Sequence, residues 1–124
     1  MSARLRATLE ARTYPVLAVV EVHDGDTYRL LLDVGFEQAS WPWLRLRGAS
    51  CPELSDTNGL AAKNAAEELL RDGVAAVTTY KRPGYSDMEK SFARYLADVH
   101  LGNGRQLADV LIEANLAVRK AQVH

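Results

Sequence analysis

The sequence predicts an α+β fold in which three strands precede a helix and two further strands precede a second helix. Three observations indicate this order: an early stretch rich in β-branched residues, an Asp-Gly hairpin signal directly after it, and two later segments with apolar residues at helical spacing. The chain has 124 residues, 48% of them hydrophobic and 25% charged, which is enough for one hydrophobic core and not for two.

The first two strands are predicted from the residues on either side of a tight turn. Val16–Val22 alternates loosely and is rich in β-branched residues, as expected of a strand. His23–Asp26 has Asp-Gly at its centre, which is the strongest short signal for a hairpin. Thr27–Val34 is therefore expected to be the returning strand.

A loop from Gly35 to about Ser40 then leads to a third strand over Trp41–Arg47. Pro42 cannot donate a hydrogen bond to a neighbouring strand, so it indicates either a strand start or an edge strand. The next segment, Gly48–Asn58, contains proline and several turn-forming residues and is predicted to be irregular.

The first helix is predicted from apolar residues that share one face. Thr57 or Asn58 is a suitable N-cap, and Asp72-Gly73 a suitable end. The residues of the apolar face are Ala62, Ala65, Ala66, Leu69 and Leu70.

The second half of the chain predicts a fourth strand over Val74–Tyr80 and a fifth over Phe92–Leu101. A second helical stripe starts at Leu107 and runs to Ala114, where Asn115 can adopt the left-handed conformation of a C-terminal cap. The apolar members of this stripe are Leu107, Val110, Leu111 and Ala114.

This order of elements matches a five-stranded Greek-key β-barrel of the OB type with two main helices. Residues 15–124 are expected to form this single domain, preceded by an N-terminal extension, residues 1–14, of uncertain structure. Leu5 and Leu9 hint at a short helix within that extension.

Charge and composition narrow the classes of partner. The net charge is −1, which disfavours a generic polyelectrolyte binder, because non-specific DNA affinity comes from many lysines and arginines. No apolar run has the length of a signal peptide or membrane span, so we expect a cytoplasmic protein without a membrane partner. By default, we expect the chain to be a monomer.

Three segments carry a resemblance to a known family. They are Val22–Thr27 (VHDGDT), Leu44–Glu53 (LRLRGASCPE) and Ser91–Ala97 (SFARYLA). In this order, and separated by the predicted helix and strands, the segments resemble the staphylococcal nuclease (thermonuclease) family. The resemblance covers roughly Val16 to Arg119, and it implies the OB-type barrel and a metal-dependent nuclease activity.

The resemblance also implies a calcium site. It makes Asp26 a direct ligand of Ca²⁺, Cys51 a ligand through its backbone carbonyl, and Glu53 a ligand through water. Ser50 stands where the family has a second aspartate, so it would be a weak substitute ligand. Calcium takes several oxygen ligands and its affinity follows their charge, so we expect weakened binding of calcium or of another divalent ion.

The catalytic residues implied by the resemblance are Arg45, Glu53 and Arg94. Arg45 and Arg94 would bind the phosphate, since a guanidinium donates two hydrogen bonds at once. Glu53 would act as the general base that takes a proton from the attacking water. The run Lys90–Ala93 departs from the family pattern before Arg94, which puts the geometry of that loop in question.

Aromatic and basic residues outside the motifs allow further substrate contacts. Lys81, Arg82 and Tyr85 form a mixed loop that can stack a base and hold a phosphate, although an ordinary solvated loop also explains them. Trp41 and Trp43 flank Pro42 and are expected to pack at the end of the barrel rather than to stack on bases.

The leading hypothesis is a Ca²⁺-dependent endonuclease that hydrolyses phosphodiester bonds of DNA, RNA or both. It would read phosphates more than bases and leave 3′-phosphate ends, as the resemblance implies. The alternative is a catalytically impaired module of the same fold that binds nucleic acid or protein, which Ser50 favours. A third class, a barrel for oligosaccharide or protein ligands, explains none of the three motifs.

Overall fold

The computed structural model describes residues 11–80 and 94–120, with no side chain described for Arg94. Its strands, in chain order, are β1 (Ala11–Asp24), β2 (Thr27–Gly35), β3 (Gln38–Ser40), β4 (Trp43–Leu46), β5 (Ala49–Ser50), β6 (Val74–Tyr80), β7 (Arg94–Leu101) and β8 (Val118–Arg119). Its helices are α2 (Thr57–Asp72) and α3 (Leu107–Glu113).

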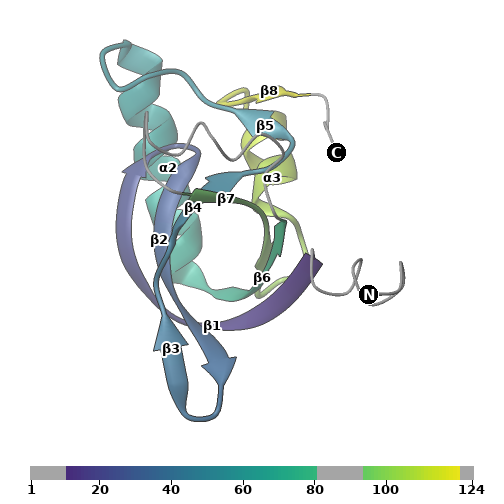
Figure 1. The fold of residues 1–124 in the computed structure, drawn as a ribbon. Coiled ribbons are helices and arrows are strands. Elements are labelled where there is room, and N and C mark those ends of the chain that lie inside the picture. Colours follow the sequence, from purple (N-terminus) through teal and green to yellow (C-terminus); the bar gives the residue numbers. More distant parts are fainter. Residues whose placement is uncertain (1–10, 81–93, 121–124) are drawn as a thin grey trace.

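Five of these strands close into a barrel, which confirms the predicted OB-like α+β fold. The hydrogen-bonded order is β1-β6-β7-β4-β2, and β1 pairs again with β2 to complete the circle (Figure 1). All barrel pairs are antiparallel except β4 with β7, which is parallel. β5 and β8 form a separate two-stranded sheet.

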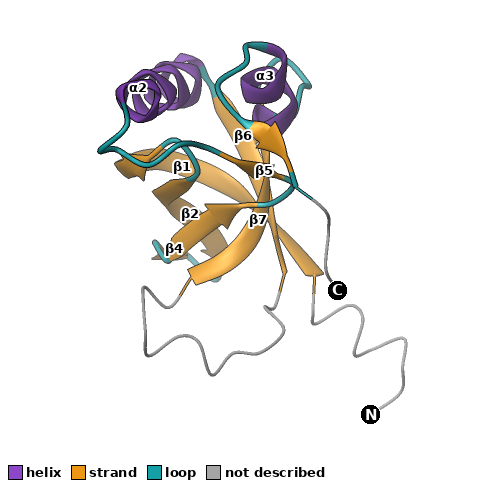
Figure 2. Cartoon of the chain, turned by 90° about the horizontal axis from the view of Figure 1, so that it is seen from above, coloured by secondary structure: helices purple, strands orange, loops and turns teal. Residues whose placement is uncertain are grey.

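The core fills the barrel and reaches under the helices. On β2 the buried residues alternate as Tyr28, Leu30 and Leu32, because successive side chains of a strand point to opposite faces. α2 contributes small buried residues at helical spacing, with Ala66 and Leu70 in the same cluster. Both helices lie on the same side of the barrel (Figure 2).

Several predicted boundaries differ from the structure. β1 begins at Ala11. Ala11–Tyr14 therefore pair with β6 and belong to the barrel, and they are not part of the predicted N-terminal extension. β3 forms within the predicted Gly35–Ser40 loop because β2 runs beyond the barrel as a hairpin, visible at the bottom of Figure 1. The expected short helix around Leu5 and Leu9 lies outside the described residues, as do Phe92 and Ala93 of the predicted fifth strand.

Two further predictions at element ends need correction. α2 is capped by Asp56, whose carboxylate accepts a hydrogen bond from Asn58 N, and not by Thr57 or Asn58. Pro42 does precede a strand start, but β4 lies between β7 and β2 and is not an edge strand. Asn115, as predicted, has a positive φ of 60° after α3.

Candidate active site

The turn between β1 and β2 holds Asp26 in a buried position. The turn contains only Gly25 and Asp26, since Asp24 pairs with Thr27. Asp26 is 4% exposed. Its backbone N–H donates to Asp24 Oδ1 at 3.1 Å, and its Oδ1 accepts from Thr27 Oγ1 at 3.3 Å. The carboxylate is thus held by its own turn.

Two other motifs meet at the same carboxylate. Cys51 N donates to Asp26 Oδ2 at 2.8 Å. Arg45 Nη2 lies 3.2 Å from the same oxygen, with one quarter of its side chain exposed. Thr27 and Arg45 are paired across β2 and β4, which explains how the hairpin turn and the third predicted strand come together. The structure therefore joins the first and second sequence motifs at one charged group.

Burial and a neighbouring carboxylate raise the pKa of Asp26 above its ordinary value of 3.8. Burial is the largest cause, and the hydrogen bond to the side chain of Asp24 is the second. The Cys51 N–H and the Arg45 guanidinium act in the opposite direction. Asp24 and Asp26 thus form a carboxylate pair whose charge is only partly compensated by Arg45.

The turn is packed directly against the segment that carries Ser50 and Cys51. A Cβ at Gly25 would lie 2.7 Å from Cys51 Sγ and 2.9 Å from Ala62 Cβ, so a side chain there has no room. Gly25 is not among the glycines with positive φ, so close packing is the reason for glycine at this position. The Tyr28 hydroxyl donates to the Gly25 carbonyl and secures the turn from inside the barrel.

Ser50 ends β5, and Cys51 follows it beside the turn. Together with Pro52 they line a cavity of about 270 Å³ whose other wall is residues 115–118. Burial, followed by the charges of Asp26 and Asp24, raises the pKa of the Cys51 thiol to about 12. The thiol is therefore neutral and packed at ordinary pH, while the amide of the same residue binds Asp26.

Glu53 lies three residues beyond Ser50, with its side chain exposed. Its backbone carbonyl accepts from Asp56 N at 2.9 Å. Within the described part of the chain, the Glu53 carboxylate makes no hydrogen bond or ion pair, so the structure does not join it to Asp26 or Arg45. It faces solvent on the segment that Cys51 connects to Asp26.

Arg94 opens β7, and its backbone pairs with Trp43 of β4. Two residues further along β7, Leu96 pairs with Arg45, so the two predicted phosphate arginines come from neighbouring strands. The side chain of Arg94 lies outside the described residues, as do the predicted substrate-binding residues Lys81, Arg82 and Tyr85.

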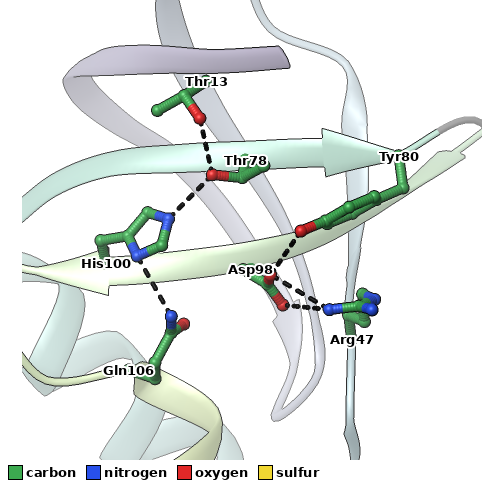
Figure 3. Close-up of polar contacts among 7 residues, drawn as sticks. All are labelled: Thr13, Arg47, Thr78, Tyr80, Asp98, His100 and Gln106. Atoms are coloured by element: carbon green, nitrogen blue, oxygen red, sulfur yellow. Dashed lines mark hydrogen bonds and ion pairs between the residues drawn. The ribbon is translucent and has the colours of Figure 1, made fainter. Parts of the chain in front are cut away.

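A polar network that the sequence did not indicate joins β6 and β7 to Arg47, the residue directly after β4 (Figure 3). Asp98 accepts from Arg47 Nη1 at 3.2 Å and from the Tyr80 hydroxyl at 2.9 Å. The Arg47 guanidinium lies 4.3 Å from the centroid of the Tyr80 ring. Arg47 is thus engaged in the barrel wall by Asp98 and Tyr80, as Arg45 is engaged by Asp26. Asp98 stands between the buried Ala97 and Val99 on β7, and this alternation is the signal in the sequence that could have placed it on the outer face.

His100 belongs to the same outer surface of β6 and β7 (Figure 3). Its Nε2 is 2.9 Å from Thr78 Oγ1, and its Nδ1 is 3.2 Å from Gln106 Nε2. Gln106 directly precedes α3, so His100 connects the helix start to the barrel.

The residues present fit a divalent cation site in part. The carboxylate pair Asp24–Asp26, the Ser50 hydroxyl and the Cys51 carbonyl are oxygen donors of the class that calcium prefers. However, no group of three His, Cys, Asp or Glu side chains able to hold a metal occurs among residues 11–80 and 94–120. The donor set therefore suits a site with few charged ligands and low affinity.

No helix within the described ranges is both long and apolar enough to cross a bilayer. No protein-family model matches the chain, and no curated protein sequence matches it either.

Proposed function

We propose that this chain is a metal-dependent phosphodiesterase that cleaves DNA, RNA or both. The observation that carries the proposal is the meeting of Asp26, Arg45 and the Cys51 amide, which come from two separate sequence motifs. The pKa of this buried carboxylate is raised and a second carboxylate, Asp24, lies beside it, and both features recur at functional sites. A cation bound there would relieve this charge.

The residues divide the chemistry as follows. Asp24, Asp26, Ser50 and the Cys51 carbonyl would hold a divalent ion, which when bound would neutralise part of the charge of the phosphate. Arg45 is partly exposed and donates to phosphate oxygens whose charge grows in the transition state. Arg94 is proposed as the second phosphate donor, from the neighbouring strand.

Glu53 is proposed as the general base. Its exposed carboxylate accepts a proton from water as the water oxygen bonds to phosphorus. The bond from phosphorus to the 5′ oxygen then breaks, that leaving oxygen takes up a proton from solvent water, and Glu53 returns its own proton to solvent. The products are a 3′-phosphate end and a 5′-hydroxyl end.

One observation favours a second candidate, a binding module without catalysis. Asp26 already engages Arg45 in an ion pair, and Ser50 offers no charge, so the protein can be stable without any metal. In that case Arg45 and the neighbouring basic residues would bind nucleic acid, and Glu53 would have no chemical role.

The decisive experiment incubates the full chain with end-labelled single-stranded DNA, duplex DNA and RNA, in calcium and then in chelator. If the chain is an enzyme, cleavage should occur in calcium and stop in chelator. The cleavage rate should fall by about 100-fold or more in Glu53→Ala and in Arg45→Ala. Glu68→Ala, which removes an exposed carboxylate from α2, is the matched control and should cleave normally.

Ser50→Asp tests the metal site separately. An added carboxylate beside the turn should lower the calcium concentration needed for half-maximal cleavage. Retained binding without cleavage in calcium, magnesium or manganese would support the module, whereas an unchanged calcium requirement in Ser50→Asp would contradict the assigned ligands.

A further inference from the structure

A row of aromatic and basic residues lies on the outer surface of the barrel, directly beside Arg45. Trp43 and Arg45 alternate with the fully buried Leu44 and Leu46 on β4, so both face outward. In the same row Arg29 of β2 pairs with Trp43, and Arg94 of β7 pairs with it from the other side. Trp43 therefore stands between the backbone positions of two arginines.

The contacts of Trp43 hold its ring in place. The Arg29 guanidinium lies 5.1 Å from the centroid of the Trp43 ring. Arg29 Nε also donates to the Trp41 carbonyl at 3.0 Å. The His23 ring meets Trp43 edge-on, with centroids 6.1 Å apart and planes at 79°. The half-buried Trp43 indole is thus fixed on two sides before any ligand binds. The neighbouring Trp41 side chain is 49% exposed.

We infer that the surface formed by Arg29, Trp41 and Trp43 binds the bases of a single-stranded nucleic acid next to the phosphate held at Arg45. The inference rests on the proposed function for the position of that phosphate. Every base has a π face, so stacking on an aromatic ring is tolerant of sequence. In a duplex the bases stack on one another, so only an unpaired strand can present a base to these indoles.

The spacing along β4 suits this arrangement. Two residues of a strand span about 7 Å, so Trp43 lies one short step from Arg45 on the same face. A strand whose phosphate contacts Arg45 thus has an adjoining base within reach of Trp43. OB-type barrels commonly bind oligonucleotides over their second and third strands, which here are β2 and β4.

The charges of this row limit its affinity for a polyanion. Arg29 supplies a cation beside the indole, and Glu21, its cross-strand partner on β1, supplies an anion. The net charge of the chain is −1, so affinity at moderate salt has to come from stacking more than from counterion release. This balance favours unpaired bases over bare phosphate as the ligand.

The test measures binding in chelator, where cleavage cannot occur. The probe is a fluorescent 12-nucleotide oligothymidylate, compared with an abasic strand of the same length and with a duplex. Trp43→Leu and Trp41→Leu should weaken binding of the oligothymidylate, about tenfold for Trp43→Leu, and should barely change binding of the abasic strand. Phe36→Leu, which removes a 97% exposed aromatic from the β2–β3 turn, is the matched control.

Charge and chemistry are separated by two further measurements. Arg29→Gln should reduce the salt dependence of binding by about one counterion, while Trp43→Leu leaves that dependence unchanged. If the protein cleaves, Trp43→Leu should raise KM for single-stranded substrate and leave kcat near its original value.

Equal affinity of wild type and Trp43→Leu for the oligothymidylate, in variants with unchanged unfolding curves, would overturn the inference. Equal affinity of wild type for the base-bearing and abasic strands would overturn it as well, as would failure to bind any strand at low salt. Loss of base-dependent binding in Trp43→Leu, in a protein that never cleaves, would support this surface while the proposed hydrolysis fails.

Discussion

The carboxylate of Asp26 shows how one buried side chain can lower the stability of a fold. Its neutral form is favoured by burial and by Asp24, so its pKa is raised in the folded chain. Because the pKa of Asp26 is higher in the folded chain, the contribution of this group to stability is complete below about pH 3.8. That contribution is lost as the pH rises through the pKa of the folded chain. At neutral pH the raised pKa of Asp26 therefore lowers the free energy of unfolding.

Asp26→Asn should for this reason raise the melting temperature by a few degrees at pH 7 in chelator, and the gain should vanish at acidic pH. An asparagine can still accept from Cys51 N and can donate to Asp24. The same variant should lose cleavage. Asp33→Asn, on β2, is the control, and a lower melting temperature of Asp26→Asn at pH 7 would show that the Arg45 ion pair outweighs burial.

The first turn of α2 positions the segment that carries Glu53. Gly59 is buried, and a Cβ there would overlap the Glu53 carbonyl oxygen. Asp56 caps the helix and also donates its N–H to that carbonyl, so the helix start and the Glu53 backbone are one packed unit.

Gly59→Ala should consequently destabilise the fold by about 1–3 kcal/mol and displace the backbone at Glu53. Cleavage should fall by more than the loss of folded protein explains. Gly102→Ala is the matched control, because its Cβ would lie 3.5 Å from the nearest atom, an ordinary contact. Thermal unfolding and initial rates on both variants check this, and a Gly59→Ala protein of normal stability would refute the packing argument.

The contact of β6 and β7 with Arg47, directly after β4, depends on Asp98. Burial, followed by the hydrogen bond and charge of Asp98, raises the pKa of Tyr80 above 10.0. Asp98→Asn keeps an acceptor near Arg47 and removes the charge, so the pKa of Tyr80 should fall toward its ordinary value. Spectrophotometric titration of wild type and Asp98→Asn measures the pKa of Tyr80, and Tyr80→Phe identifies its signal. Identical tyrosine titration curves in wild type and Asp98→Asn would contradict the network.

The barrel as a unit is expected to lose stability in alkali. Tyr28 is fully buried and its pKa lies well above 10.0, while that of Cys51 is about 12. Both groups ionise more readily in the unfolded chain. Their stabilising contribution is therefore complete below pH 9 for Cys51 and below pH 10 for Tyr28, and it is lost as pH rises through the folded values.

Urea unfolding between pH 8 and 12 should accordingly show a falling free energy, with a slope of up to about 1.4 kcal/mol per pH unit from each group. Cys51→Ala should flatten the slope above pH 9, and Tyr28→Phe above pH 10. Tyr28→Phe also loses the hydrogen bond to Gly25, so it should be less stable by about 1 kcal/mol at pH 8. Parallel curves for all three proteins would contradict the assignment.

The sequence alone determined the order of the five barrel strands and the two helices, because that order depends on local patterns, but it did not predict the short strands β3, β5 and β8. β6 (Val74–Tyr80) and the end of α2 at Asp72-Gly73 lie where apolar spacing and glycine predicted them. The sequence placed the start of the first strand at Val16, whereas β1 begins at Ala11, and it missed β3. Both are decided by pairing with another strand rather than by their own residues. The cap at Asp56 was missed by one residue for a local reason, the choice among adjacent polar side chains.

Only the tertiary structure decided which side chains meet. The sequence motifs selected Asp26 and Arg45, but their ion pair requires the β2–β4 register, and the Cys51 amide reaches Asp26 through the packing of Gly25. The network of Arg47, Tyr80 and Asp98 and the position of Trp43 between two arginines also arise from barrel closure. Contacts across 18 to 51 residues of chain depend on strand register and packing, which no local pattern of residues specifies.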